Sequence, residues 1–265
     1  MSYLLTAKNL SKQFTQTHGF FSRKKTVIHA LDNVSLNITK GTTLAVVGES
    51  GSGKSTLARS LIRLVSIDKG KITFNDKDFL SLDSTALKNT RKNIQMIFQD
   101  PYASLNPRMK IQSIMEEPLL IHKIGTKTSK QKKIEMMIKR VGLNLSDLDK
   151  YPHQFSGGQR QRIGIARALI LEPKLVICDE PVSALDVSVQ AQIVQLLKSL
   201  QKEFGLTYLF ITHDLRIVRH IADEVVVMRH GKIVETGKTD IIFQNPKTTY
   251  TTKLLASIPG AKKLT

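Results

Sequence analysis

The sequence has little cysteine, few acidic residues for its number of basic ones and no long apolar run, and these shortages exclude several protein classes. Cys178 is the only cysteine, which excludes a disulfide scaffold and a multi-cysteine zinc or iron–sulfur site. No stretch reaches the roughly 18 apolar residues that span a bilayer. Residues 1–10 lack a basic start followed by an apolar core, so no secretory signal is expected. We therefore expect a soluble, intracellular protein.

The shortage of acidic residues leaves a large positive charge. Forty Lys and Arg residues stand against 22 Asp and Glu, for a formal net charge of +18. This excess indicates either an anionic partner (nucleic acid, nucleotide or a membrane surface) or a lysine-rich solvated surface. The segment 123–140 holds seven basic residues, one acid and no aromatic residue. The absence of aromatic side chains there argues against a platform for single-stranded nucleic acid.

The chain does contain an alternation of strand and helix patterns over 265 residues, enough for one large domain or two small ones. Several strand patterns are nearly continuous apolar runs, which are typical of a parallel sheet covered on both faces. Residues 101–168 have helix patterns and little strand signal, which predicts a helical insert in an α/β core. The predicted strands are 27–38, 43–47, 71–74, 93–98, 175–178, 208–212 and 224–228, and residues 15–25 are predicted to form a loop between early strands. Apolar residues at helical spacing are Leu57, Leu61, Leu64, Val187, Ala191, Val194 and Leu200.

The strongest local signal is a glycine-rich loop between a predicted strand and a predicted helix. It fits the pattern G-x-x-x-x-G-K-[ST], in which backbone N–H groups and the helix N-terminus surround phosphate oxygens. Lys54 is expected to reach the β- and γ-phosphates of a nucleotide, and the Ser55 hydroxyl to bind Mg²⁺. The spacing does not fit a dinucleotide-binding loop. The expected phosphate-binding residues are Gly48, Glu49, Ser50, Gly51, Ser52, Gly53, Lys54, Ser55 and Thr56.

A second strand pattern ends in two acids, Asp179 and Glu180. A carboxylate at a strand end beside a phosphate loop can hold Mg²⁺, directly or through water, so Asp179 is a candidate metal ligand. Glu180, one residue later, is a candidate to polarise an attacking water. Cys178 lies within the apolar strand, where core packing is its expected role.

A second glycine-rich segment lies at the N-terminus of a predicted helix, and it carries the first resemblance to a specific protein family. The segment FSGGQRQR at 155–162 resembles the signature motif of ATP-binding cassette (ABC) ATPases, with Phe155 where the family usually has leucine. One nucleotide does not need two phosphate cradles. The resemblance implies that this second cradle grips the γ-phosphate of ATP bound to an opposing subunit, through Ser156, Gly157, Gly158 and Gln159.

Other family motifs follow in the family order, and the resemblance covers essentially the whole chain. It implies that Gln99 lies near Mg²⁺ and the attacking water, that Asp186 lies at the subunit interface and that His213 contacts the γ-phosphate. It also assigns adenine stacking to Phe14, with Phe20 or Phe21 as substitutes. The implied cofactors are ATP and Mg²⁺, with Glu180, His213 and Gln99 as catalytic residues and Ser55, Gln99 and Asp179 as metal ligands.

The resemblance also implies a fold. The expected class is α/β, a P-loop NTPase (RecA-like) core with an antiparallel β subdomain and an inserted α-helical subdomain. Residues 1–265 would form a single ABC nucleotide-binding domain. Its core would be about 1–100 and 169–265, and its helical subdomain about 101–168. The chain has no long coiled coil, zinc cysteines, second cassette or membrane spans, which excludes several other ABC classes and leaves a separate transporter ATPase.

Longer segments are similar to the peptide and nickel importer subfamily, most closely to the F-type ATPase of oligopeptide, dipeptide or antimicrobial-peptide uptake. They are FQDPYASLNPRM at 98–109, EEPL at 116–119, residues 151–194 and NPKTTYTTKLLASIP at 245–259. The implied function is ATP-driven peptide import. Nickel or metal-chelate import, export and a nucleic-acid-linked ATPase remain alternatives.

The implied partners are two multi-span permease subunits, a second ABC ATPase as a heterodimer partner and, indirectly, an extracytoplasmic binding protein, with no nucleic acid. The implied location is peripheral, on the cytoplasmic face of the inner membrane.

Overall fold

The computed structural model describes residues 2–17 and 25–258 and divides the chain into two compact units. The first unit comprises Met1–Asp83 and Leu209–Thr265, and the second comprises Ser84–Tyr208. The chain passes from the second unit into the first within strand β8 (Thr207–Ile211). Among the described residues, no helix combines the length and apolar character needed to cross a membrane.

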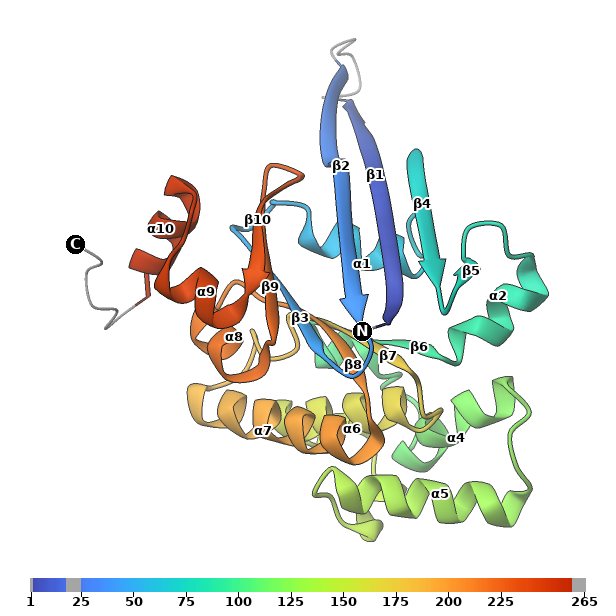
Figure 1. Ribbon diagram of the computed structural model, residues 1–265. Helices are drawn as coiled ribbons and strands as arrows, with labels where there is room; N and C mark the ends of the chain where they lie inside the picture. Colours follow the sequence, from blue (N-terminus) through green and yellow to red (C-terminus); the bar gives the residue numbers. More distant parts are fainter. Residues whose placement is uncertain (1, 18–24, 259–265) are drawn as a thin grey trace. The chain divides into compact units, whose positions relative to one another are not determined.

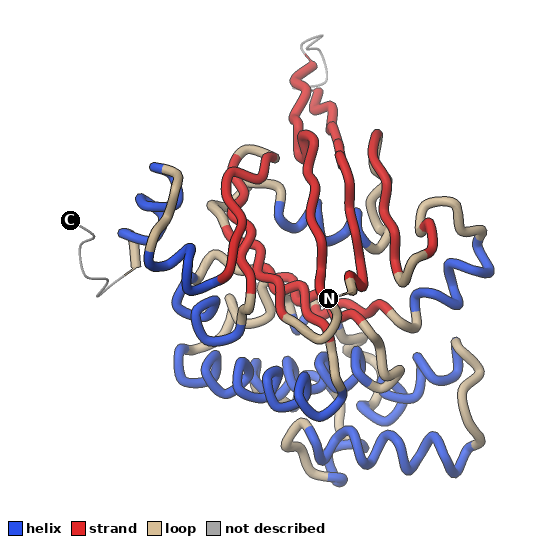
Figure 2. Tube along the Cα trace, viewed as in Figure 1, coloured by secondary structure: helices blue, strands red, loops and turns tan. Residues whose placement is uncertain are grey.

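The first unit contains the antiparallel sheet implied by the family resemblance. Its strand order is β2-β1-β4-β5, and its long β1–β2 hairpin is shown in red in Figure 2. Asn75 and Asp76, both with positive φ, form the tight turn between β4 and β5. The sequence predicts a loop at 15–25 between early strands but gives no bounds for the strand before it. Residues 15–17 of that range belong to β1 and Lys25 belongs to β2, while residues 18–24 lie outside the described residues. The strands are β1 (Tyr3–Thr17), β2 (Lys25–Thr39), β4 (Lys69–Phe74) and β5 (Lys77–Asp78).

A second group of strands in the first unit builds the core beneath the phosphate loop. The order is β10-β9-β3-β8, with β3 parallel to β9 and β10 antiparallel to β9. All five residues of β3 are buried, as its continuous apolar run predicts. The strands and helices are β3 (Thr43–Val47), β9 (Glu224–Arg229), β10 (Lys232–Lys238), α1 (Lys54–Leu61), α8 (Leu215–Ile221), α9 (Thr239–Gln244) and α10 (Thr249–Ala256).

The second unit combines parallel strands with a helical segment, and its order is β8-β7-β6. Residues 101–168 contain helices and short 3-10 turns but no strand, as their sequence predicts. Within this segment α4, α5 and α6 contact one another, and Figure 1 shows α4 beside α5. The elements are α2 (Ser84–Arg91), β6 (Ile94–Ile97), α3 (Pro101–Ser104), α4 (Ile111–Ile121), α5 (Lys127–Arg140), α6 (Gly157–Leu169), β7 (Leu175–Asp179) and α7 (Val187–Phe204).

Two of the predicted helical stripes need correction. Helix α1 ends at Leu61, because Arg63 adopts a positive φ and donates its guanidinium to the carbonyl oxygens of Phe79 and Leu82. Leu64 therefore lies beyond the helix and is 53% exposed. In α7, Val187 and Ala191 are exposed, and the buried stripe instead consists of Ile193, Val194, Leu197 and Leu200.

Candidate nucleotide site

The phosphate loop lies between β3 and α1 in the first unit, as its sequence predicts. Lys54 opens α1 and is only 4% exposed. Its ammonium donates to the carbonyl oxygens of Gly48 and Glu49, each at 2.8 Å, and to the Ser52 hydroxyl at 3.4 Å. The loop thus curls around the lysine ammonium at the start of α1.

Two glycines let this loop approach the neighbouring backbone. Gly48 and Gly53 have φ of 148° and 103°, which L side chains rarely adopt. A Cβ on Gly48 would overlap the carbonyl oxygen of Met228 in β9, and one on Gly53 would overlap that of Ala30 in β2. Backbone packing therefore requires glycine at both positions.

Gly48→Ala is expected to lower both the free energy of unfolding and nucleotide affinity. Backbone strain and the overlap with the Met228 carbonyl oxygen should each lower the free energy of unfolding by about 1–3 kcal/mol. Gly51→Ala is the matched control, because Gly51 also has a positive φ but a Cβ there meets nothing within 4 Å. Urea unfolding and nucleotide titration check the prediction. Equal effects of the two substitutions would show that the contact with β9 does not matter.

The candidate adenine platform, Phe14, lies on β1 opposite Ile28 of β2. Its side chain is 42% exposed, as a stacking surface requires, and the Lys12 ammonium lies 5.5 Å from its ring centroid. Phe20 and Phe21, the predicted substitutes, lie outside the described residues.

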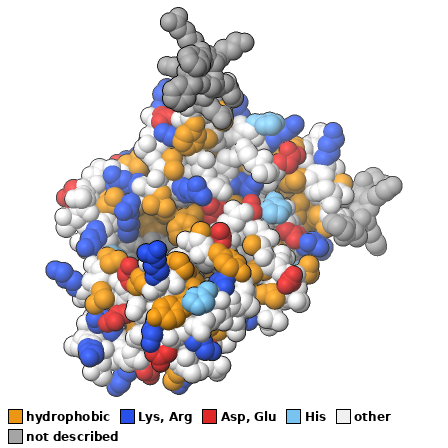
Figure 3. Space-filling model, turned by 180° about the vertical axis from the view of Figure 1, so that it is seen from behind, with side chains coloured by type: hydrophobic (Ala, Val, Ile, Leu, Met, Phe, Trp, Pro, Cys, Tyr) orange, Lys and Arg blue, Asp and Glu red, His pale blue; other side chains and the backbone are white. Residues whose placement is uncertain are grey.

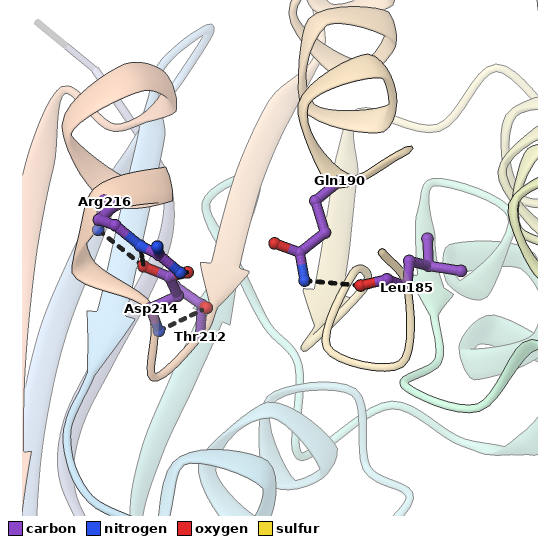
Figure 4. A network of polar contacts seen from close by, with 5 residues as sticks. All are labelled: Leu185, Gln190, Thr212, Asp214 and Arg216. Carbon is purple, nitrogen blue, oxygen red and sulfur yellow. Dashed lines mark hydrogen bonds and ion pairs between the residues drawn. The ribbon is translucent and has the colours of Figure 1, made fainter. Parts of the chain in front are cut away.

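His213 lies between two residues whose backbone is fixed. Thr212 donates its N–H to Val46 of β3 at 3.2 Å, which brings the residue before His213 close to the strand that leads into the phosphate loop. Asp214 donates its N–H to the Thr212 hydroxyl at 3.0 Å and accepts from the Arg216 N–H at 2.9 Å as the N-cap of α8 (Figure 4). His213 itself is exposed.

Arg216 adds a positioning contact that the sequence reasoning missed. Its guanidinium donates to both carboxylate oxygens of Asp214, at 3.0 and 2.7 Å, and this contact lowers the pKa of Asp214 below its ordinary value (Figure 4). The usable sequence signal is an Asp two residues before an Arg at the start of an amphipathic helix, directly after the candidate histidine.

In the second unit, the structure brings Gln99 and Glu180 together. Gln99 follows β6 and donates its side-chain amide to the Glu180 carboxylate at 3.2 Å. Glu180 follows β7 and has φ of 48°, an unusual conformation for a non-glycine residue that is often found at functional sites. Asp179 ends β7 and is 1% exposed. Ser55, Asp179 and Gln99 each carry a side-chain oxygen, the ligand type that Mg²⁺ prefers.

Cys178 belongs to the core, as expected. It is fully buried in β7, and burial followed by the nearby Asp179 charge raises the pKa of its thiol far above the ordinary value. A thiol held protonated in this way is a poor nucleophile.

The signature segment forms the start of α6. Ser156 is the N-cap: its hydroxyl accepts from the Gln159 N–H at 3.3 Å, and the Gln159 side chain accepts from the Ser156 N–H at 3.0 Å. The sequence indicates that Gly157 and Gly158 precede the helix, but the helix begins at Gly157, so both glycines lie within its first turn. The reciprocal capping bonds account for this earlier start.

The signature glycines also pack against the segment that carries Asp186. A Cβ on Gly157 would meet Leu185 at 3.3 Å, and one on Gly158 would meet Val189 at 2.6 Å. The Gln190 side chain donates to the Leu185 carbonyl at 2.9 Å, which fixes the turn before α7 (Figure 4). Asp186 is exposed at the N-cap of α7 but makes no side-chain capping bond there.

The basic segment 123–140 is partly neutralised by acids of the second unit. Lys130 pairs with Glu116 at 3.0 Å, Lys133 with Glu172 at 2.8 Å, and Arg140 with Glu203. On the face drawn in Figure 3, basic side chains are interspersed with acidic and apolar ones. On this face the positive charge is therefore distributed, and part of the segment 123–140 forms ion pairs within the second unit.

Comparison with known proteins accounts for this set of motifs. The model of the ABC transporter family matches residues 31–183. Oligopeptide transport ATP-binding protein AppF of Bacillus subtilis is 52% identical over 98% of this chain and 79% of its own length. Dipeptide transport ATP-binding protein DppF of Escherichia coli is 51% identical over 97% of this chain and 76% of its own length.

A solved structure extends the likeness to three dimensions. It is the dimeric, post-hydrolysis state of the ATP-binding cassette MJ0796 bound to ADP and phosphate. It superimposes with a TM-score of 0.77 at 31% identity, over 89% of this chain and 98% of the other. The α/β cassette fold with its antiparallel sheet is thereby confirmed, and the chain belongs to the ATP-binding subunits of the ABC transporter family, in the group of peptide importer ATPases.

Proposed function

We propose that this chain hydrolyses ATP to drive peptide import across the cytoplasmic membrane. The observation that carries this proposal is the phosphate loop, in which Lys54 is buried at the start of α1 and held by loop carbonyl oxygens. The names of relatives about half identical to this chain support peptides as the cargo.

We assign the binding of adenine and of the phosphates to residues of the first unit. Adenine stacks on Phe14, and the phosphates bind the loop 48–56 with Lys54 at the β- and γ-phosphates. Ser55, Asp179 and Gln99 would hold Mg²⁺, which would neutralise phosphate charge. His213 contacts the γ-phosphate, and the Thr212–Asp214–Arg216 contacts keep its backbone in place.

Glu180 is the proposed general base for hydrolysis. Its carboxylate accepts a proton from the attacking water as the water oxygen bonds to the γ-phosphorus and the bond from that phosphorus to the bridging oxygen of ADP breaks. The Gln99 amide orients the carboxylate. The left-handed backbone of Glu180 sets the direction in which its side chain leaves the end of β7.

Full activity requires a second cassette. The N-terminus of α6, with Ser156, Gly157, Gly158 and Gln159, binds the γ-phosphate of ATP held by that partner, and Asp186 lies at the interface. The dimeric state of the similar cassette MJ0796 supports this arrangement.

We assign as partners a second, different ATPase, two multi-span permease subunits that dock on the helical segment 101–168, and an extracytoplasmic binding protein that acts through them. The chain then lies peripherally on the cytoplasmic face of the membrane.

The cargo class can be tested by stimulation of ATP hydrolysis. The assembled complex, reconstituted in nanodiscs, is given the binding protein loaded with a peptide mixture, with a nickel chelate, or without cargo. Peptide loading is expected to raise the hydrolysis rate, and this effect should disappear with EDTA. Stimulation by the nickel chelate alone would assign the chain to metal uptake instead, and stimulation by DNA or RNA without cargo would point to a nucleic-acid-linked ATPase.

A further inference from the structure

The C-terminal part of the first unit is tied to β10 by one buried carboxylate. Glu235 is 7% exposed and accepts from the Lys247 N–H at 2.8 Å, the Thr248 N–H at 3.1 Å and the Thr248 hydroxyl at 3.0 Å. Burial alone would raise the pKa of Glu235, but these hydrogen bonds and one from Thr251 outweigh it and lower the pKa. Glu235 is therefore held as an anion that fixes the segment before α10.

Helix α10 begins at this fixed point and carries Tyr250 in its first turn. The Thr248 hydroxyl caps the helix by accepting from the Thr251 N–H at 3.1 Å. The Tyr250 ring lies 4.8 Å from the Arg229 guanidinium and packs against a core cluster that includes Val47 and Val227. Val47 is the last residue of β3, directly before the phosphate loop.

The Tyr250 hydroxyl reaches the phosphate loop itself. It accepts a hydrogen bond from the backbone N–H of Glu49 at 3.3 Å, across 201 positions of sequence. That N–H belongs to the same planar peptide as the carbonyl oxygen of Gly48, which accepts from the Lys54 ammonium at 2.8 Å. Since the two groups of a trans peptide point in opposite directions, Tyr250 and Lys54 hold one peptide of the loop from its two sides.

We propose that Tyr250 is a positioning residue for ATP binding, which makes the C-terminal helix part of the nucleotide site; this inference rests on the proposed function. When phosphates draw the Lys54 ammonium toward them, the Gly48 carbonyl oxygen loses a donor, and the Tyr250 hydroxyl remains to keep this peptide in place. Tyr250 does not touch the reacting atoms, so its contribution lies in nucleotide affinity and not in the chemical step.

Tyr250→Phe tests the inference, because it removes the hydroxyl and keeps the ring over Arg229. A neutral hydrogen bond of this kind corresponds to about a two- to tenfold effect on affinity. In the full chain, the Kd for fluorescent methylanthraniloyl-ATP should rise by that factor. In the assembled complex, the KM for ATP should rise similarly while kcat at saturating ATP stays unchanged.

Thr252→Val is the matched control. It also removes one hydroxyl from α10, but that hydroxyl donates to the Thr248 carbonyl at 3.1 Å and the structure gives it no bond to the loop. Its Kd should equal that of the unsubstituted chain. Tyr250→Leu, which loses ring and hydroxyl together, should weaken binding at least as much as Tyr250→Phe.

The outcomes separate this inference from the proposed function. If the unsubstituted chain binds ATP and Lys54→Ala does not, the ATP-binding part of the proposed function stands. An unchanged Kd in Tyr250→Phe would then overturn the positioning role, and weaker binding in Tyr250→Leu alone would reduce Tyr250 to a packing residue. A fall in kcat without a change in KM would also contradict the inference. If the unsubstituted chain binds no ATP, the proposed function itself fails.

Discussion

Glu180→Gln in the assembled complex is expected to slow ATP hydrolysis by about 10²–10⁴-fold, the usual contribution of a positioned general base. The substitution keeps the size of the side chain and an oxygen that can accept from the Gln99 amide, so the turn after β7 should persist. ATP affinity should therefore stay close to that of the unsubstituted complex. The rate of phosphate release and the Kd for ATP, measured on the same preparation, check both halves of the prediction.

Glu172→Gln is a suitable control for this experiment. Glu172 lies in the same unit, also has a positive φ and pairs with Lys133, but it carries no proposed chemistry. Its substitution should leave the hydrolysis rate nearly unchanged, because an exposed ion pair contributes little to the stability of the fold. Near-normal hydrolysis in Glu180→Gln would remove Glu180 as the base and would direct attention to Gln99 and His213.

Ser156→Arg is expected to have the second largest effect, and it should act on the partner's nucleotide. The substitution removes the cap of α6 and places a bulky cation where the γ-phosphate of the partner's ATP would meet the helix N-terminus. Loss of one preorganised hydrogen-bond donor that faces developing negative charge typically slows a reaction by about 10²–10³-fold. ATP trapped at the partner's site of the cross-linked complex should decrease, while ATP binding to this chain's own loop should not.

Ser156→Thr serves as its conservative counterpart. Threonine keeps the capping hydroxyl and should retain most of the hydrolysis rate. Equal ATP occupancy of the partner's site in Ser156→Arg and in the unsubstituted complex would show that this segment does not bind the partner's nucleotide.

The parts of the fold that the sequence predicted are those with strong local patterns. The apolar runs at β3 and β7 and the helical segment 101–168 are examples. The bounds of strand β1 were not predicted, because polar residues interrupt its pattern, and its pairing with β2 and β4 defines them. The early end of α1 depends on the Arg63 contacts with two distant carbonyl oxygens, which no local pattern reveals.

The candidate site likewise combines motifs that the sequence reveals with supporting contacts that it does not reveal. Contiguous motifs such as the phosphate loop can be found from sequence, because the loop chemistry requires glycine, lysine and serine at fixed spacing. The supporting contacts cannot be found in this way. The Tyr250–Glu49 bond joins residues 201 positions apart, and Glu235 binds backbone N–H groups, which every non-proline residue carries. Such contacts follow from the tertiary fold and not from residue identity.

The most direct test of the account is ATP-driven peptide accumulation in proteoliposomes that contain the two permease subunits, this chain and its partner ATPase. With the binding protein and peptide on one side and ATP at the cassettes, peptide should accumulate against its gradient. Accumulation should stop when this chain carries Lys54→Ala, because its phosphate loop then lacks the ammonium that binds the β- and γ-phosphates. Undiminished accumulation with Lys54→Ala would contradict the claim that ATP bound by this chain drives import.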